Sequence, residues 1–99
     1  MWTQESRSPA IIFFVWDIQK AESNRFSHGI RFEDAATVFL DPFFKVLDGS
    51  RDGEERQAAI GFDRLARLLY VVHIEFDGDC IRLISARLAT TTEETEYVD

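Results

Sequence analysis

Two histidines and a few arginines are the residues in this sequence whose side chains could do chemistry. An imidazole can move a proton, and a guanidinium can hold a phosphate through two parallel hydrogen bonds. His28 precedes Gly29 and lies close to Arg31, so it could reach into a groove from the end of a helix. The alternative is that His28 only completes that helix, where a cation meets the negative end of the helix dipole.

Glu55 and Arg56 are a second candidate. A carboxylate beside a guanidinium can act as a base next to a phosphate clamp, but it can equally be a surface ion pair of small energetic worth. Arg82 and Arg87 are a third candidate, but their odd spacing would place them on opposite faces of an unbroken strand. Either the strand ends or bulges near Ser85, or only one arginine lines a site. Of the two, we favour Arg82, which lies inside the strand.

Three further residues, Trp16, Lys20 and Arg31, could contact a nucleic acid. Trp16 shares a strand face with Phe14, and aromatic rings on a strand can stack on bases, although they more often belong to a core. Lys20 faces outward near a helix start, where it could contact phosphate or simply be solvated.

No cofactor or metal is expected. The acidic residues have no spacing typical of a metal site, and the sequence contains no glycine-rich phosphate loop and no Ser/His/Asp nucleophile signature. The single cysteine, Cys80, excludes a disulfide framework or a cysteine-rich zinc site within the chain.

The net charge of −7 argues against a general polyanion binder, because phosphate affinity comes largely from Lys and Arg. Residues 88–99 carry four acidic residues and no basic one. The apolar run at residues 10–16 is too short to span a membrane, and no secretory signal precedes it. We expect a cytoplasmic protein with a polar tail at 1–9 and a single domain at 10–99.

The first half of the chain predicts a strand followed by two helices. The β-branched and aromatic run ending at Trp16 is typical of a strand. Asp17 is a good N-cap, and Gly29 is placed to end the first helix. Apolar residues at helical spacing predict a second helix over 32–40, which a proline then stops.

The second half predicts an antiparallel sheet. Strands are expected at 43–47, 56–62, 68–76 and 80–86, with the nearly all-apolar third one in the centre, covered on both faces. Asp77-Gly78 is a hairpin signal, and Thr90 with Glu93 has capping-box spacing for a short C-terminal helix. The fold class is therefore α+β: a mostly antiparallel sheet with two N-terminal helices packed on it and a short C-terminal helix.

An ordered set of short stretches has a familiar pattern. An aromatic-x-Trp-Asp element leads into a helix with Lys and Asn, and a His-Gly-apolar-x-Phe-Glu-x-Ala junction follows. The stretches are Phe14–Asp17, Lys20, Asn24, His28–Ala36, Val38–Pro42, Gly53–Arg56, Gly61, Arg67–His73, Ile81–Arg87, Ala89–Thr90 and Tyr97. Together they resemble the BrnT-type toxin family over about residues 11–97.

The resemblance implies a fold similar to the RelE-type ribonuclease toxins and metal-independent cleavage of RNA. It also implies a ribbon-helix-helix antitoxin of the BrnA type as partner, with DNA contacted only through that antitoxin. Such a nuclease needs a base for the ribose 2′-hydroxyl, an acid for the leaving 5′-oxygen and cations for the phosphorane. The expected catalytic residues are His28, Glu55, Arg56, Arg82 and Arg87.

Two positions depart from the family pattern. The family usually has a lysine before the His-Gly pair, where this chain has Ser27, and it follows Ser-Ala-Arg with an arginine-rich helix, where this chain has an acidic one. Acidic residues repel RNA, so a second hypothesis is a catalytically inactive module that still docks a basic antitoxin. Convergence of His28, Arg56, Arg82 and Arg87 on one open face would favour the enzyme. If these four residues are dispersed, or if each is held in an ion pair, the binding module is favoured.

Overall fold

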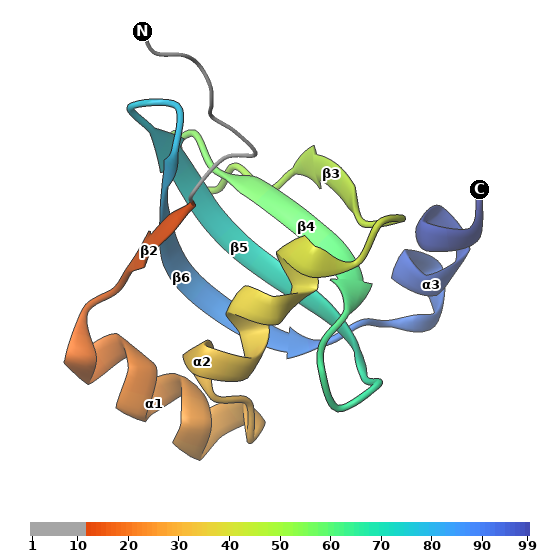
Figure 1. Ribbon diagram of the computed structural model, residues 1–99, viewed down its shortest axis with the longest axis horizontal. Helices are drawn as coiled ribbons and strands as arrows, with labels where there is room; N and C mark the ends of the chain where they lie inside the picture. Colours follow the sequence, from red (N-terminus) through yellow and green to blue (C-terminus); the bar gives the residue numbers. More distant parts are fainter. Residues whose placement is uncertain (1–11) are drawn as a thin grey trace, which may run out of the picture.

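The computed structural model describes residues 12–99, which form a five-stranded sheet with helices packed against it (Figure 1). The strands lie in the order β2-β6-β5-β4-β3. The predicted tail at 1–9 lies outside the described residues. The strand bounds are β2 (Phe13–Val15), β3 (Lys45–Asp48), β4 (Gln57–Phe62), β5 (Leu68–Phe76) and β6 (Cys80–Leu88). The apolar run at 68–76 is the central strand, as predicted.

The sheet is mixed, so the expectation of a mostly antiparallel sheet is corrected. Strands β3 to β6 are joined by antiparallel pairings, but β2 runs parallel to β6, with Phe14 opposite Ile81. Turn residues such as Asp77 and Gly78, both at positive φ, indicate a hairpin partner in the sequence. No comparable local signal exists for a parallel partner far along the chain, which is why the pattern missed this pairing.

Helix α1 (Ile18–His28) has the predicted ends. The Asp17 carboxylate accepts hydrogen bonds from the backbone N–H groups of Gln19 and Lys20 at 2.8 and 3.1 Å. Gly29 has a φ of 72° and donates its N–H to the carbonyl of Arg25, which is the left-handed cap that favours glycine. The local sequence therefore sets where His28, the last residue of α1, is presented.

The predicted second helix is replaced by two short pieces, α2 (Phe32–Ala35) and the 3₁₀ helix η1 (Ala36–Leu40). The Thr37 hydroxyl donates to the Asp34 carbonyl at 2.6 Å, a local bond that competes with regular α-helical pairing. The C-terminal helix α3 (Thr91–Val98) begins with the predicted capping box between Thr90 and Glu93.

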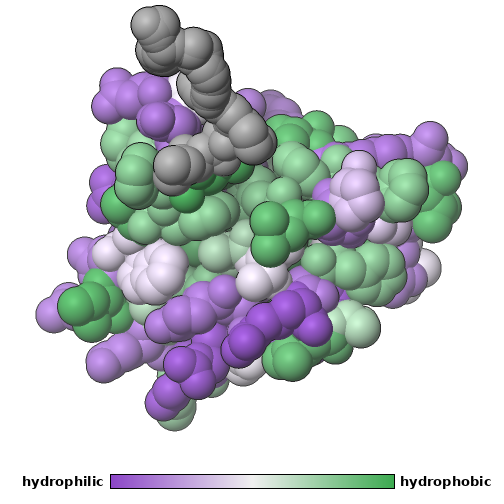
Figure 2. Space-filling model, viewed as in Figure 1, coloured by the Kyte–Doolittle hydropathy of each residue, from purple (hydrophilic) through white to green (hydrophobic). Residues whose placement is uncertain are grey.

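The hydrophobic core lies between the sheet and the α1–α2–η1 layer that crosses it (Figure 1). Phe32, Val38, Leu69, Val71 and Leu83 are fully buried there. Truncating a buried Phe or Leu to Ala costs about 2–5 kcal/mol, so this layer fixes the sheet and the helices as one unit. Figure 2 shows the same side, with hydrophobic side chains across its middle and hydrophilic ones at its upper corners and along much of its lower edge.

The opposite face of the sheet is only partly covered. Along β5, Leu69, Val71 and His73 are buried towards the helices, whereas Tyr70 and Val72 alternate with them and stay half-buried. The expectation that β5 is covered on both faces is therefore wrong. No helix among residues 12–99 is long and apolar enough to cross a membrane.

Candidate functional site

A bulge in β6 puts both of its arginines on the open face of the sheet. Arg82 pairs with Ile74 and Arg87 with Tyr70, two β5 residues that share a face because they are four apart. The register shifts between the two pairings by one extra residue in β6. The bulge that the sequence left open as an alternative is present, and it cancels the odd spacing of the two arginines.

A cleft of about 500 Å³ lies on this open face. It collects polar side chains from four elements: the end of α1, the loop after β3, β5 and β6. The lining includes His28, Arg51, Arg56, Tyr70, Ser85 and Arg87. Three of the five predicted catalytic residues, His28, Arg56 and Arg87, are therefore brought together. With Arg51, the lining carries three guanidiniums and one carboxylate, that of Asp48, although the chain as a whole is acidic.

Two of the cleft arginines are paired with carboxylates. Arg56 contacts Glu54, and Arg87 donates to both oxygens of Glu93 at 2.8 and 2.9 Å. The hydrogen bonds between these two side chains lower the pKa of Glu93 and raise the pKa of Arg87. The guanidinium of Arg87 also lies 4.3 Å from the centre of the Tyr70 ring, a cation–π contact. His28 and Arg51 have no ion-pair partner among residues 12–99.

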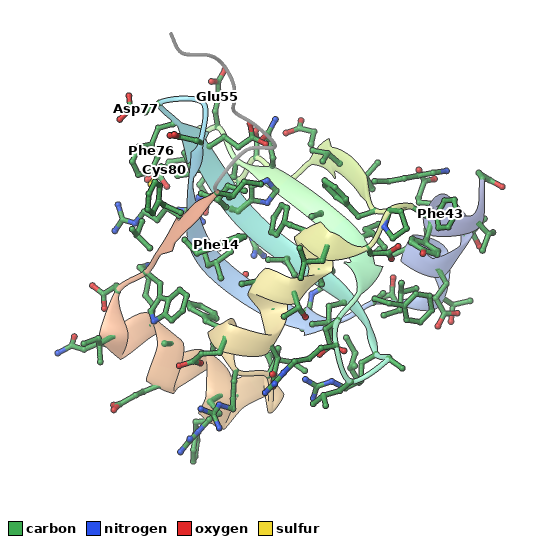
Figure 3. The ribbon with its side chains drawn as sticks, in the orientation of Figure 1. Phe14, Phe43, Glu55, Phe76, Asp77 and Cys80 are labelled. Atoms are coloured by element: carbon green, nitrogen blue, oxygen red, sulfur yellow. The ribbon has the colours of Figure 1, made fainter. Side chains whose placement is uncertain are left out.

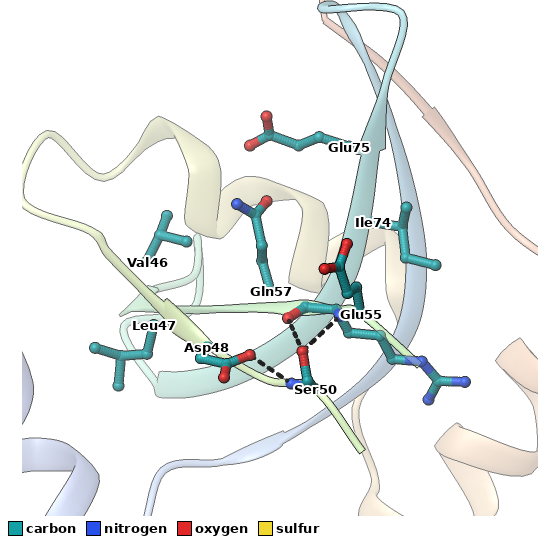
Figure 4. A pocket seen from close by; sticks show the side chains of 9 residues that line it. Val46, Leu47, Asp48, Ser50, Glu55, Gln57, Ile74 and Glu75 are labelled. Atoms are coloured by element: carbon teal, nitrogen blue, oxygen red, sulfur yellow. Dashed lines mark hydrogen bonds between the residues drawn. The ribbon is translucent and has the colours of Figure 1, made fainter. Parts of the chain in front are cut away.

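Glu55 lies outside this cleft, in a neighbouring hollow of about 720 Å³ (Figure 4). Asp48, Ser50 and Arg56 line both hollows and so form the wall between them. The Ser50 backbone N–H donates to Asp48 at 2.9 Å, and its hydroxyl accepts from the Arg56 backbone N–H at 3.2 Å. Figure 3 shows Glu55 at the same end of the sheet as the hairpin residue Asp77.

Arg82 is exposed and is not part of the cleft lining. Its pairing partner Ile74 lies four residues along β5 from Tyr70, which separates the backbones of Arg82 and Arg87 by about 13 Å. Ile74 lines the hollow that contains Glu55. Arg82 and Glu55 therefore belong to the far end of the same face, and the preference for Arg82 over Arg87 as the cleft arginine does not fit this geometry.

The three predicted RNA-contacting residues are separated. Lys20 lines a shallow groove beside β6 together with His28 and Ser85, so it adjoins the cleft. Trp16 and Arg31 line a different hollow, of about 960 Å³, on the other side of α1. The Trp16 ring packs edge-on against Phe32 with their centres 5.9 Å apart, and Arg31 lies 3.8 Å from Glu33.

The second histidine, His73, belongs to the core. It is fully buried, its Nδ1 lies 3.1 Å from the Val71 carbonyl and its ring packs edge-on against Phe39. Burial lowers the pKa of His73, so the ring is neutral at pH 7. Within residues 12–99, no three side chains are grouped as they would be to hold a metal ion.

Three residues that shape the cleft were not predicted as site residues from the sequence: Asn24, Arg51 and Tyr70. The buried Asn24 amide joins α1 to β6, which brings His28 next to Ser85. Arg51 reaches the cleft from the turn after β3, and Tyr70 lies beneath Arg87. The Asp77-Gly78 hairpin alone would have placed Tyr70 opposite Ala86, and only the bulge in β6 moves Tyr70 opposite Arg87.

The fold and the cleft define a small α+β protein with a cationic site on one open sheet face. A family model described as the ribonuclease toxin BrnT of type II toxin–antitoxin systems matches residues 16–93. The chain therefore belongs to the BrnT family of toxins, as its ordered motifs predicted. Membership in a type II system implies an antitoxin partner.

A solved structure gives an independent view of the fold. The crystal structure of the Brucella abortus ribonuclease toxin BrnT superimposes with a TM-score of 0.64 at 24% identity. The match covers 82% of this chain and all of the Brucella chain, and at this identity it supports the fold alone. No curated protein matches the sequence significantly.

Proposed function

We propose that this protein is an active endoribonuclease toxin that cleaves RNA in the cleft lined by His28, Arg56 and Arg87. The observation that carries the proposal is the convergence of one imidazole and three guanidiniums, with Arg51 as the third, in an otherwise acidic chain. A site that concentrates positive charge on a negative protein suits a polyanionic substrate. Family membership supplies the class of reaction.

The chemistry needs no metal. The ribose 2′-oxygen gives up its proton and attacks the adjacent phosphorus, the bond from phosphorus to the 5′-oxygen breaks, and that oxygen takes up a proton. The products are a 2′,3′-cyclic phosphate and a free 5′-hydroxyl. His28 would exchange these protons, while Arg56 and Arg87 would stabilise the charge on the phosphorane. We further propose that the fold is RelE-like, as the resemblance implied.

We assign the remaining predicted residues roles according to their distance from the cleft. Lys20 adjoins the cleft and would contact a flanking phosphate. Glu55 and Arg82 lie further along the same face and would contact RNA beyond the scissile bond. Trp16 and Arg31 are left outside the proposed site because they line a hollow on the other side of α1.

The experiment is growth of a bacterial culture after induction of this protein alone, with RNA integrity followed on gels. Wild-type protein should arrest growth and degrade RNA, and His28→Ala should do neither. Arg25→Ala, which removes an exposed cation from the other side of α1, is the matched control and should behave as wild type. Cleavage by purified protein in excess chelator tests metal independence. Normal growth and intact RNA with soluble, folded wild-type protein would contradict the proposal.

A specific observation favours a second candidate, a catalytically inactive module that docks a basic ribbon-helix-helix antitoxin. Two cleft arginines are already paired with Glu54 and Glu93, and α3 presents further carboxylates to a cationic partner. Co-purification with an antitoxin encoded beside it, without growth arrest by the free protein, would favour this candidate.

A further inference from the structure

The C-terminal helix α3 is held to the body of the protein at two points. At its start, Glu93 pairs with Arg87, and near its end the Tyr97 hydroxyl donates to Asp41 at 2.8 Å. The Tyr97 ring also packs edge-on against Phe62, with centres 5.4 Å apart. No residue of α3 is buried, and a helix of eight residues is marginal without tertiary support. These contacts near its two ends are therefore what keeps α3 in place.

The contact at Glu93 engages Arg87, which lines the cleft. Its carboxylate meets the Arg87 guanidinium with one oxygen on each terminal nitrogen, which is the arrangement that an arginine offers to a phosphate. The Glu93 side chain is only 16% exposed, so little room remains on that side of the guanidinium. The Tyr70 ring covers another side at 4.3 Å. The phosphate-binding edge of Arg87 is taken by the chain's own carboxylate.

We propose that Glu93 is an internal competitor for the phosphate subsite of Arg87, so that RNA engages this arginine only when the start of α3 releases. The inference rests on the proposed function, because it takes RNA as the ligand of the cleft. Tyr97 would keep α3 tethered through Asp41 and Phe62 while Glu93 leaves. A ligand that needs a minor open state binds more weakly by the fraction of molecules that are open.

The substitution Glu93→Gln tests this role while it leaves the N-terminal cap of α3 in place. Glutamine at the third helical position preserves the capping box with Thr90, so α3 still has its N-terminal cap. It removes the negative charge and one of the two acceptor oxygens that hold Arg87. Glu96→Gln is the matched control, since it removes one negative charge from the same helix and Glu96 makes no ion pair or side-chain hydrogen bond within the described part of the chain.

The probe is a fluorescent single-stranded RNA carrying 2′-O-methyl riboses, which the proposed reaction cannot cleave. We expect Glu93→Gln to bind this probe about fivefold more tightly than wild type, as release of a partly exposed ion pair allows. Glu96→Gln should change the affinity by less than twofold. Adding Arg87→Ala to Glu93→Gln should abolish the gain. If wild type binds the probe, equal gains in both glutamine variants, or no gain in Glu93→Gln, would overturn the inference.

A second measurement separates failure of the inference from failure of the proposed function. Inorganic pyrophosphate replaces RNA as the probe, because it offers phosphate oxygens without ribose or base. If no form of the protein binds or cleaves RNA, the proposed function fails. Competition at Arg87 is then supported if Glu93→Gln binds pyrophosphate more tightly through Arg87, and it is overturned if the two glutamine variants bind equally. If wild type cleaves RNA and the glutamine variants do not differ, only the inference fails.

Discussion

The Asn24 side chain hydrogen-bonds both backbone groups of Ala86 on the edge of β6. Its amide nitrogen donates to the Ala86 carbonyl at 2.8 Å, and its amide oxygen accepts from the Ala86 N–H at 2.9 Å. Strand β2 ends before this point, at the pairing of Val15 with Arg82, so the amide stands where a neighbouring strand would continue. His28 lies one helical turn after Asn24, and this contact therefore anchors the end of α1 beside the cleft.

Replacing Asn24 with Ala should destabilise the fold by about 2–4 kcal/mol, because both Ala86 backbone groups lose their partner in a buried place. Urea unfolding followed by circular dichroism measures the change. Ser23→Ala, at the exposed neighbouring position, should leave the midpoint unchanged within about 0.5 kcal/mol. An Asn24→Ala protein as stable as the Ser23→Ala control would show that water replaces the amide without cost.

Gly61 on β4 should resist even the smallest substitution. A Cβ atom there would come within 2.9 Å of the Phe44 Cβ and 3.0 Å of a Val38 methyl carbon, both in tightly packed positions. Gly61→Ala should therefore cost about 1–3 kcal/mol through overpacking. The reverse comparison, Ala58→Gly on the same strand, tests whether β4 is simply sensitive to any change. If Gly61→Ala unfolds at the wild-type urea concentration, the packing argument is wrong.

The sequence predicted the features that depend on residues close together along the chain. The Asp17 and Gly29 caps, the Asp77-Gly78 hairpin and the α3 capping box each depend on residues within one turn of one another, and all are present. The central place of β5 followed from its apolar run. The order of the family motifs predicted the family, which the family match confirms.

What the sequence missed depends on pairings between distant segments. The parallel register of β2 on β6 and the Asn24–Ala86 contact have no local signal. The bulge in β6 was one of two alternatives, and the sequence favoured Arg82, whereas Arg87 is the arginine that lines the cleft. The acidic α3 predicted repulsion of RNA or attraction of a basic antitoxin, but its docking onto Arg87 appears only once the strand and the helix are placed together.

The two arginines of β6 should differ in their effect on RNA cleavage. Arg87 lines the cleft with His28, whereas Arg82 is about 13 Å further along the strand. We expect Arg87→Ala to reduce cleavage by at least about a hundredfold, the usual loss when a transition-state donor is removed. Arg82→Ala should reduce it by less than about tenfold, as for one lost phosphate contact. Cleavage rates of both purified variants under identical salt decide the order, and a larger loss in Arg82→Ala would reverse our assignment.

Tyr70 should act through its ring and not through its hydroxyl. The ring lies under the Arg87 guanidinium, and a cation–π contact at a partly exposed site is worth about 0.5–1 kcal/mol. Tyr70→Phe should therefore keep wild-type affinity for uncleavable RNA, and Tyr70→Leu should bind about two- to fivefold more weakly. Fluorescence anisotropy titrations measure both. A loss in Tyr70→Phe as large as in Tyr70→Leu would indicate that the hydroxyl contacts the ligand directly.

Acid should release α3 before it unfolds the sheet. The hydrogen bonds from Arg87 lower the pKa of Glu93 from its ordinary 4.5, so the folded state binds this proton less readily than the unfolded chain. The contribution of the pair to stability is therefore fully present above pH 4.5 and is lost as the pH falls through and below that value. Because Arg87 is partly exposed, the loss is at most about 1 kcal/mol.

Hydrogen exchange of the α3 amides measures this release. After correction for the intrinsic exchange rates, exchange in the wild type should accelerate between pH 5 and 3. Glu93→Gln should show the fast exchange already at neutral pH. A wild-type α3 whose corrected protection stays constant over that range would mean that the ion pair does not hold the helix.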